Sequence, residues 1–135
     1  MQTFIGTKIV RAEPMSRQAY NDLRGWHLPD DEVGTDEGYL VEYTDGGKPN
    51  HHAFEGYISW SPKEQFELAY LPVPEGVQPI VLYVTQPALE LVIGALRKLP
   101  HEQVHELVHD LWQQYQSQAS RLAVAHVAEE TGLTD

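Results

Sequence analysis

The sequence contains no cysteine, and its 9 Lys and Arg residues are outnumbered by 20 Asp and Glu. Without thiols the chain cannot form disulfide bonds, thiolate metal sites or cysteine nucleophiles, and it suits a reducing compartment. It also has no apolar run of the roughly eighteen residues that a membrane span requires, and no charged-then-apolar signal peptide. We therefore expect no membrane association and a cytoplasmic location.

The formal net charge of −11 is large for 135 residues. It argues against nucleic acid as a partner, because phosphate contacts require a basic surface. An acidic chain could instead target a basic surface on another protein, although solubility alone would explain the charge equally well. The apolar fraction of 41% is enough to bury a core, and the length fits one domain or one small domain with an appendage.

Alternating apolar residues and turn signals predict an α+β fold, with a small antiparallel sheet and two short helices in the first half of the chain. Ser16 is the expected N-cap of the first helix, and Gly25 its end. The expected strands cover residues 4–13, 38–44 and 56–60, and the expected helices cover residues 16–24 and 62–69.

The third expected strand runs directly into the second helix. Ser61 is placed to be the N-cap, Pro62 to occupy the first helical position and Glu64 to complete a capping box. Four positions separate Phe66 from Tyr70, which predicts that both lie on one face of this helix.

The second half of the chain is predicted to be a helical hairpin with one long helix. A Pro-rich connector at residues 72–79 separates it from the α+β domain of residues 1–71, and residues 80–135 form the second region. Within that region we expect a strand at residues 80–84, a helix capped by Thr85 at residues 86–98, and a helix at residues 100–130 stopped by Gly132.

The long helix predicts a homodimer. At about 1.5 Å per residue it spans roughly 45 Å, and the helix before it is less than half as long. Its apolar positions alternate by three and four, as in a coiled-coil seam, so a part of the seam needs another partner. A four-helix bundle of two copies would cover it. The expected interface residues are Val108, Leu111, Tyr115, Leu122 and Ala125.

Two overlapping copies of the zinc-protease pattern H-E-x-x-H begin the long helix, through His101, His105 and His109. Histidines four residues apart share a helix face and can bind Zn²⁺. A catalytic zinc needs a third protein ligand, however, and the acidic residues downstream lie roughly 30 Å away along the helix. We therefore expect no metal and no cofactor, and interpret the histidines as an exposed polar stripe. The residues turned inward are then Val104, Leu107, Val108 and Leu111.

A candidate binding site combines aromatic residues of the small sheet with polar groups of the loop before its third strand. Aromatic side chains on one sheet face can stack a base or form a hot spot for a protein partner. The alternative is that they form the core of a small domain. No phosphate-binding glycine loop or nucleophile elbow accompanies them, which predicts a protein without enzymatic activity. The candidate binding residues are Trp26, Tyr39, Lys48, Asn50, His51, Tyr57 and Trp60.

Five segments in the first 71 residues resemble the N-terminal domain of many phage-encoded small proteins of unknown function. They read FIGTKIVRA, YNDLRGW, DEGYLVEY, GGKPNH and GYISWSPKEQFELAY. In related phage proteins a similar domain is fused to a small β-barrel of the Thoeris anti-defence type, which sequesters a cyclic ADP-ribose isomer. That barrel is not apparent in this sequence.

The resemblance implies a phage origin and two classes of function. The first is a non-enzymatic accessory protein that binds a host protein, such as a component of anti-phage defence. The second is a protein that sequesters a nucleotide signal. A zinc-dependent hydrolase is a remote third class, kept only because of the H-E-x-x-H pattern.

Overall fold

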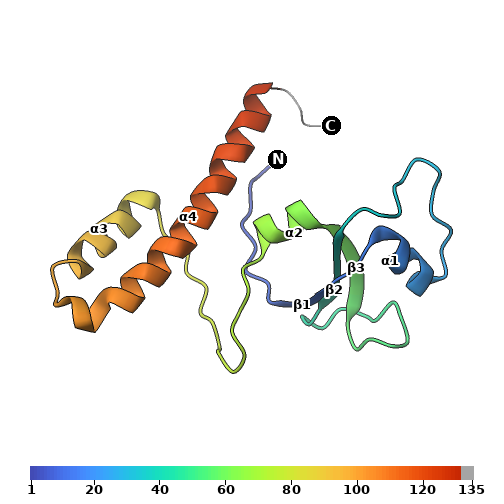
Figure 1. Ribbon diagram of the computed structural model, residues 1–135, viewed down its shortest axis with the longest axis horizontal. Coiled ribbons are helices and arrows are strands. Elements are labelled where there is room, and N and C mark those ends of the chain that lie inside the picture. Colours follow the sequence, from blue (N-terminus) through green and yellow to red (C-terminus); the bar gives the residue numbers. More distant parts are fainter. Residues whose placement is uncertain (132–135) are drawn as a thin grey trace. The chain divides into compact units, whose positions relative to one another are not determined.

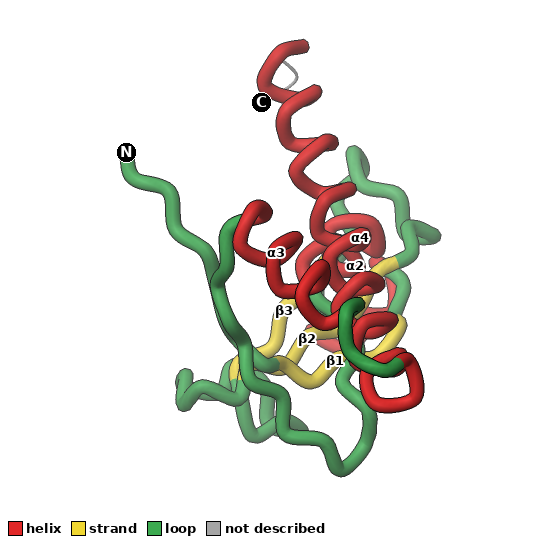
Figure 2. The backbone as a smooth tube through the Cα atoms, turned by 90° about the vertical axis from the view of Figure 1, so that its left-hand side faces the viewer, coloured by secondary structure: helices red, strands yellow, loops and turns green. Residues whose placement is uncertain are grey.

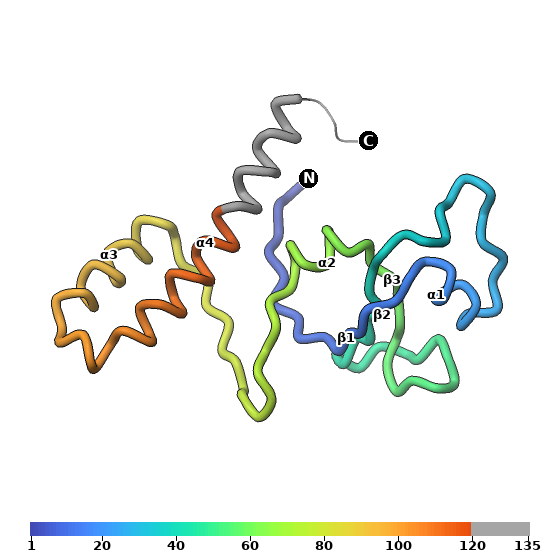
Figure 3. The backbone as a smooth tube through the Cα atoms, in the orientation of Figure 1, coloured from blue at the N-terminus to red at the C-terminus, as the bar shows by residue number. Residues whose placement is uncertain are grey.

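The computed structural model describes the backbone of residues 1–131 and the side chains of residues 1–119 (Figures 1 and 3). The chain divides into two compact units, Met1–Pro74 and Glu75–Asp135. The division lies within the expected connector. Each unit is described by itself.

The first unit is built on a three-stranded antiparallel sheet of strand order β1-β2-β3 (Figure 2). In β1–β2 pairing Val10 lies opposite Tyr43, and in β2–β3 pairing Leu40 lies opposite Trp60. The predicted α+β class is therefore confirmed. The strands are β1 (Val10–Pro14), β2 (Gly38–Tyr43) and β3 (Tyr57–Pro62), and the helices are α1 (Arg17–Arg24) and α2 (Lys63–Ala69).

Helix α1 has the two caps that the sequence predicts. Ser16 Oγ accepts a hydrogen bond of 3.2 Å from the backbone N–H of Ala19. Gly25 ends the helix with a φ of 67°, a left-handed conformation that glycine adopts without steric cost. Both signals are local in sequence, so no distant contact was needed to find them.

The two short helices lie on opposite faces of the sheet. Tyr20 of α1 is buried in a cluster with Leu40 and Ile58. Phe66 of α2 stacks on Tyr39, with ring centroids 4.2 Å apart. Because Tyr39 and Leu40 are neighbours in one strand, their side chains point to opposite faces. Phe66 also stacks on Tyr70 at 4.9 Å, as their spacing predicts.

The first strand is shorter than predicted, beginning at Val10 instead of residue 4. Tyr43 is the last residue of β2 and lies opposite Val10, so the residues before Val10 have no strand to pair with. The chain after β2 leaves the sheet through Gly46, whose φ is 88°. The hydrophobic pattern alone therefore predicted a first strand that extends beyond the end of β2, the strand with which it pairs.

The predicted capping role of Ser61 is wrong. Strand β3 continues through Ser61, which lies opposite Tyr39, and ends at Pro62. Helix α2 therefore begins at Lys63, with Pro62 at the N-cap position and no side-chain cap. The Lys63 N–H instead donates to the carbonyl of Glu37 at 3.1 Å, so a backbone group from the neighbouring segment does the work expected of the serine.

The second unit is the predicted helical hairpin, formed by α3 (Gln86–Leu96) and α4 (His101–Thr131). Thr85 caps α3 by accepting from the Ala88 N–H at 3.4 Å, as predicted. Tyr115 joins the two helices, because its hydroxyl accepts from Gln86 Nε2 at 2.9 Å. The expected strand at residues 80–84 is absent, since this segment has no pairing partner in the part of the chain that is described. The expected stop, Gly132, lies outside the described residues.

Candidate functional site

The four aromatic residues predicted as one binding surface do not gather on one face of the sheet. Trp60 lies on the face covered by α1, where its Nε1–H donates to the Met15 carbonyl at 2.8 Å. Tyr39 and Tyr57 lie on the opposite face, since β2 pairs Tyr39 with Ser61 and Tyr43 with Tyr57. Trp26 follows α1 and packs edge-on against Tyr20, at 6.1 Å between ring centroids.

Asn50 forms two hydrogen bonds with the backbone of Ile58. Its Oδ1 accepts from the Ile58 N–H at 2.7 Å, and its Nδ2 donates to the Ile58 carbonyl at 2.9 Å. The amide thus satisfies outward-facing groups of β3 as another strand would. Its polar atoms are occupied within the fold, which favours a structural role.

His51 is also held by backbone groups. Its Nδ1 accepts from the Ala53 N–H at 3.2 Å, and its Nε2 lies 3.2 Å from the Leu23 carbonyl. These contacts tie the loop to the end of α1. Lys48, the third predicted loop residue, is exposed.

Glu42 is a buried polar residue that the sequence did not single out. Its Oε1 accepts two hydrogen bonds of 3.0 Å, from the N–H groups of Glu55 and Gly56. Arg11 lies 3.4 Å from the other oxygen. The available signal was a carboxylate in the middle of the apolar strand GYLVEY, where an unpaired charge would be costly.

An open hollow of about 480 Å³ lies where Tyr57 and Tyr43 meet the N-terminal segment. Lys8 forms an ion pair of 2.6 Å with Asp45 there, and its ammonium lies 5.1 Å from the Tyr43 ring centroid. The hydrogen bond from Lys8 lowers the pKa of Asp45, and the same bond raises the pKa of Lys8. The charges of Lys8 and Asp45 neutralise each other. Of the predicted binding residues, only Tyr57 borders this hollow.

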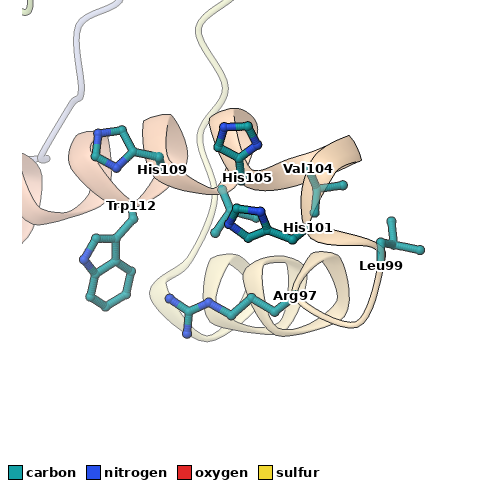
Figure 4. A pocket seen from close by; sticks show the side chains of 8 residues that line it. Arg97, Leu99, His101, Val104, His105, His109 and Trp112 are labelled. Carbon is teal, nitrogen blue, oxygen red and sulfur yellow. The ribbon is translucent and has the colours of Figure 1, made fainter.

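The three histidines of the H-E-x-x-H patterns lie together beside a second hollow, of about 350 Å³, between α3 and α4 (Figure 4). The rings of His101 and His105 are nearly parallel, with centroids 4.8 Å apart. Nowhere in the described residues do three His, Asp or Glu side chains converge as they would around a metal ion. Besides the three histidines, the residues that line this hollow are Arg97, Leu99, Val104, Val108 and Trp112.

Sequence reasoning missed Arg97 and Trp112. The guanidinium of Arg97 lies 5.5 Å from the indole centroid of Trp112, and Figure 4 shows its side chain extending toward that ring. A basic residue in the turn after α3 carries no periodic signal, so only the hairpin geometry brings it beside α4.

The predicted inward face of α4 is only partly correct. Val104, Val108 and Leu111 are half-buried, but Leu107 is 50% exposed. Leu107 lies outside the narrow strip that the single helix α3 covers. Among the predicted interface residues Tyr115 is half-buried and bonded to α3, and the side chains of Leu122 and Ala125 lie outside those described.

Helix α3 leaves an apolar surface uncovered. Ile93 is its one fully buried residue, whereas Leu91 and Val92 are 75% and 49% exposed. The five apolar residues that precede the helix cap are also exposed. They are Ile80, Val81, Leu82, Tyr83 and Val84.

Comparison of the chain with protein-family models, with curated proteins and with solved structures finds no match. The helices in the described part of the chain are each too short or too polar to cross a bilayer.

Proposed function

We propose that this chain is a non-enzymatic phage accessory protein that binds a host protein, with a component of anti-phage defence as the target. The observation that carries the proposal is the composition of α3. Gln86 and Glu90 are its only polar side chains, so it is apolar on nearly every side, yet Ile93 alone is buried. A helix that is apolar all round normally lies inside a protein, which means that another surface covers this one.

Charge favours a basic host surface as the partner. From residue 75 onward the sequence has eight acidic and three basic side chains, so its apolar surface is carried by a negatively charged unit. Complementary charge speeds the encounter with a partner and suppresses wrong partners. The proposed place of action is the host cytoplasm, where such a target would be met.

The first unit supports a binding function without catalysis. Asn50, His51 and Glu42 are its most prominent polar side chains, and each is engaged by backbone groups of the fold. We therefore assign them to the scaffold that holds the loop of residues 44–56.

The test is capture of the partner from infected host cells with the full chain as bait. Leu91→Glu places a charge in the exposed apolar surface of α3, and Gln103→Glu adds the same charge at an exposed polar position of α4. The wild type and Gln103→Glu should recover one host protein in near-equimolar amount, and Leu91→Glu should lose it while keeping its helical circular dichroism.

Equal recovery of that protein by Leu91→Glu would contradict the proposed surface. A wild-type chain that recovers no host protein in stoichiometric amount would contradict the proposed function.

A further inference from the structure

Four of the eight basic side chains that the structure describes are paired with carboxylates. Ion pairs join Lys8 to Asp45, Arg11 to Glu42, Arg17 to Glu32 and Lys63 to Glu37. Arg97 resembles Arg24 in having an aromatic ring as its described partner, and for Arg97 that ring is Trp112. No Asp or Glu is among the described residues that line the hollow beside it. A pocket without carboxylates is unexpected in a chain with 20 of them.

One arginine and three histidines border this hollow from two elements. Arg97 follows α3, and His101, His105 and His109 lie on successive turns of α4 (Figure 4). Protonated imidazole offers two N–H donors and guanidinium offers five, and neither can accept a hydrogen bond. The hollow is thus lined by hydrogen-bond donors together with the apolar side chains of Leu99, Val104 and Val108.

The rings of His101 and His105 are stacked with centroids 4.8 Å apart, so their N–H groups lie close together on one side of the hollow. A multiply charged anion could bridge donors spaced in this way. His101 also lies in the first turn of α4, where the helix amides favour negative charge.

The charged neighbours are distributed so that the hollow itself stays positive. On α4 each histidine is followed by an acidic residue, Glu102, Glu106 or Asp110, which the helix turns about 100° away from it. On the side of α3 the charged groups are Glu90, Arg97 and Lys98, and Glu90 lies 3.5 Å from the Tyr115 hydroxyl and does not line the hollow.

Trp112 limits the kind of anion that fits. One neighbour of its ring is Arg97, and the other is Tyr115, whose centroid lies 5.3 Å away. The indole therefore positions the guanidinium. A ligand would be recognised by its charge.

We propose that the hollow between α3 and α4 binds a small phosphate-type anion with two or more negative charges, through Arg97 and the protonated imidazoles of His101 and His105. This site is separate from the exposed apolar surface of α3 to which the host-protein function is assigned.

The test is isothermal titration of the full chain with inorganic pyrophosphate at pH 6 and pH 8, in the same chloride concentration. Affinity at pH 6 should exceed that at pH 8 by about tenfold, because imidazoles gain charge over this range. Arg97→Gln should weaken binding by about tenfold at both pH values, the usual effect of losing one charge-assisted hydrogen bond. His105→Gln should remove most of the pH dependence.

His27→Gln is the matched control, because His27 is an exposed histidine of the other unit. It should bind pyrophosphate as the wild type does. Adenosine diphosphate should bind no more tightly than pyrophosphate, since the proposed site recognises charge. Binding that ignores both pH and Arg97→Gln would overturn the proposal, as would the absence of measurable binding at pH 6.

Discussion

The side chain of Asn50 pairs with the backbone of Ile58 through both of its polar atoms, at 2.7 and 2.9 Å. This geometry imitates one rung of an antiparallel ladder. It holds the loop of residues 44–56 against β3 without adding a strand.

Asn50→Ala should lower the free energy of unfolding of the first unit by about 2 kcal/mol, because it leaves the Ile58 N–H without a partner and its carbonyl with only the 3.4 Å bond from the Tyr20 hydroxyl. Urea denaturation followed by tryptophan fluorescence measures this, in a Trp112→Phe background that confines the signal to Trp26 and Trp60. Lys48→Ala, at an exposed position of the same loop, should change the value by less than about 0.5 kcal/mol. Equal stability of the two variants would show that the amide bonds are dispensable.

Gly56→Ala should destabilise the first unit strongly. A Cβ atom at Gly56 would lie 2.1 Å from the carbonyl oxygen of Tyr43, and neither backbone can move without disturbing the β2–β3 pairing. We expect a loss of about 3 kcal/mol in the same assay, at the upper end for overpacking. Gly6→Ala is the control, since a Cβ there meets no atom within 4 Å. A wild-type midpoint for Gly56→Ala would mean that the turn into β3 is looser than described.

The ion pair between Lys8 and Asp45 should be visible in acid titration. Its hydrogen bond holds the pKa of Asp45 below the ordinary value, so the stability it contributes is present above that value and is lost as the pH falls through the lowered pKa. Lys8→Gln should move the Asp45 carboxyl resonance titration upward in NMR. Lys48→Gln should leave it in place, and an identical Asp45 titration in all three proteins would refute the pairing.

The predicted homodimer is tested by light scattering. The wild type should have about twice the chain mass at micromolar concentration, because apolar residues of α4 such as Leu107 lack a cover. Leu107→Glu should shift the protein toward monomer, and Gln103→Glu should not. A monomeric wild type would contradict the predicted homodimer. The exposed residues would then be available to the proposed host partner.

The exposed segment that precedes α3 should be the first site of proteolysis. Leu82 and Tyr83 are 78% and 76% exposed and belong to no helix or strand, so chymotrypsin can reach them. Mass spectrometry should detect early fragments that begin near residue 83 or 84. Early cleavage inside α4, with this segment intact, would contradict its exposure.

Sequence predicted the features that depend on neighbouring residues. The caps of α1 and α3 at Ser16 and Thr85 and the stacking of Phe66 on Tyr70 need only local geometry. The prediction for Ser61 was wrong because Ser61 pairs with Tyr39 in the sheet, and Tyr39 is distant in the sequence. The strands predicted at residues 4–9 and 80–84 are absent for the converse reason. A segment with a strand-like sequence forms a strand only where another strand pairs with it.

The candidate site also could be predicted only as far as neighbouring residues determine it. The sequence identified Asn50 and His51 as polar loop residues, but their partners Ile58 and Leu23 decide their role and are not adjacent in sequence. The histidines of α4 were found as a pattern, whereas Arg97 and Trp112 joined them only through the turn of the hairpin.

The sheet has two unlike edges. Directly after β1 the N–H of Met15 donates to the Gly38 carbonyl, and antiparallel alternation then turns the N–H groups of Val10 and Ala12 outward. At the other edge the outward groups of Ile58 are occupied by Asn50. A strand added at β3 would have to displace the asparagine, whereas a strand added at β1 would meet the outward N–H groups of Val10 and Ala12. The asparagine therefore protects one edge of the sheet from edge-to-edge pairing, and β1 has no such block.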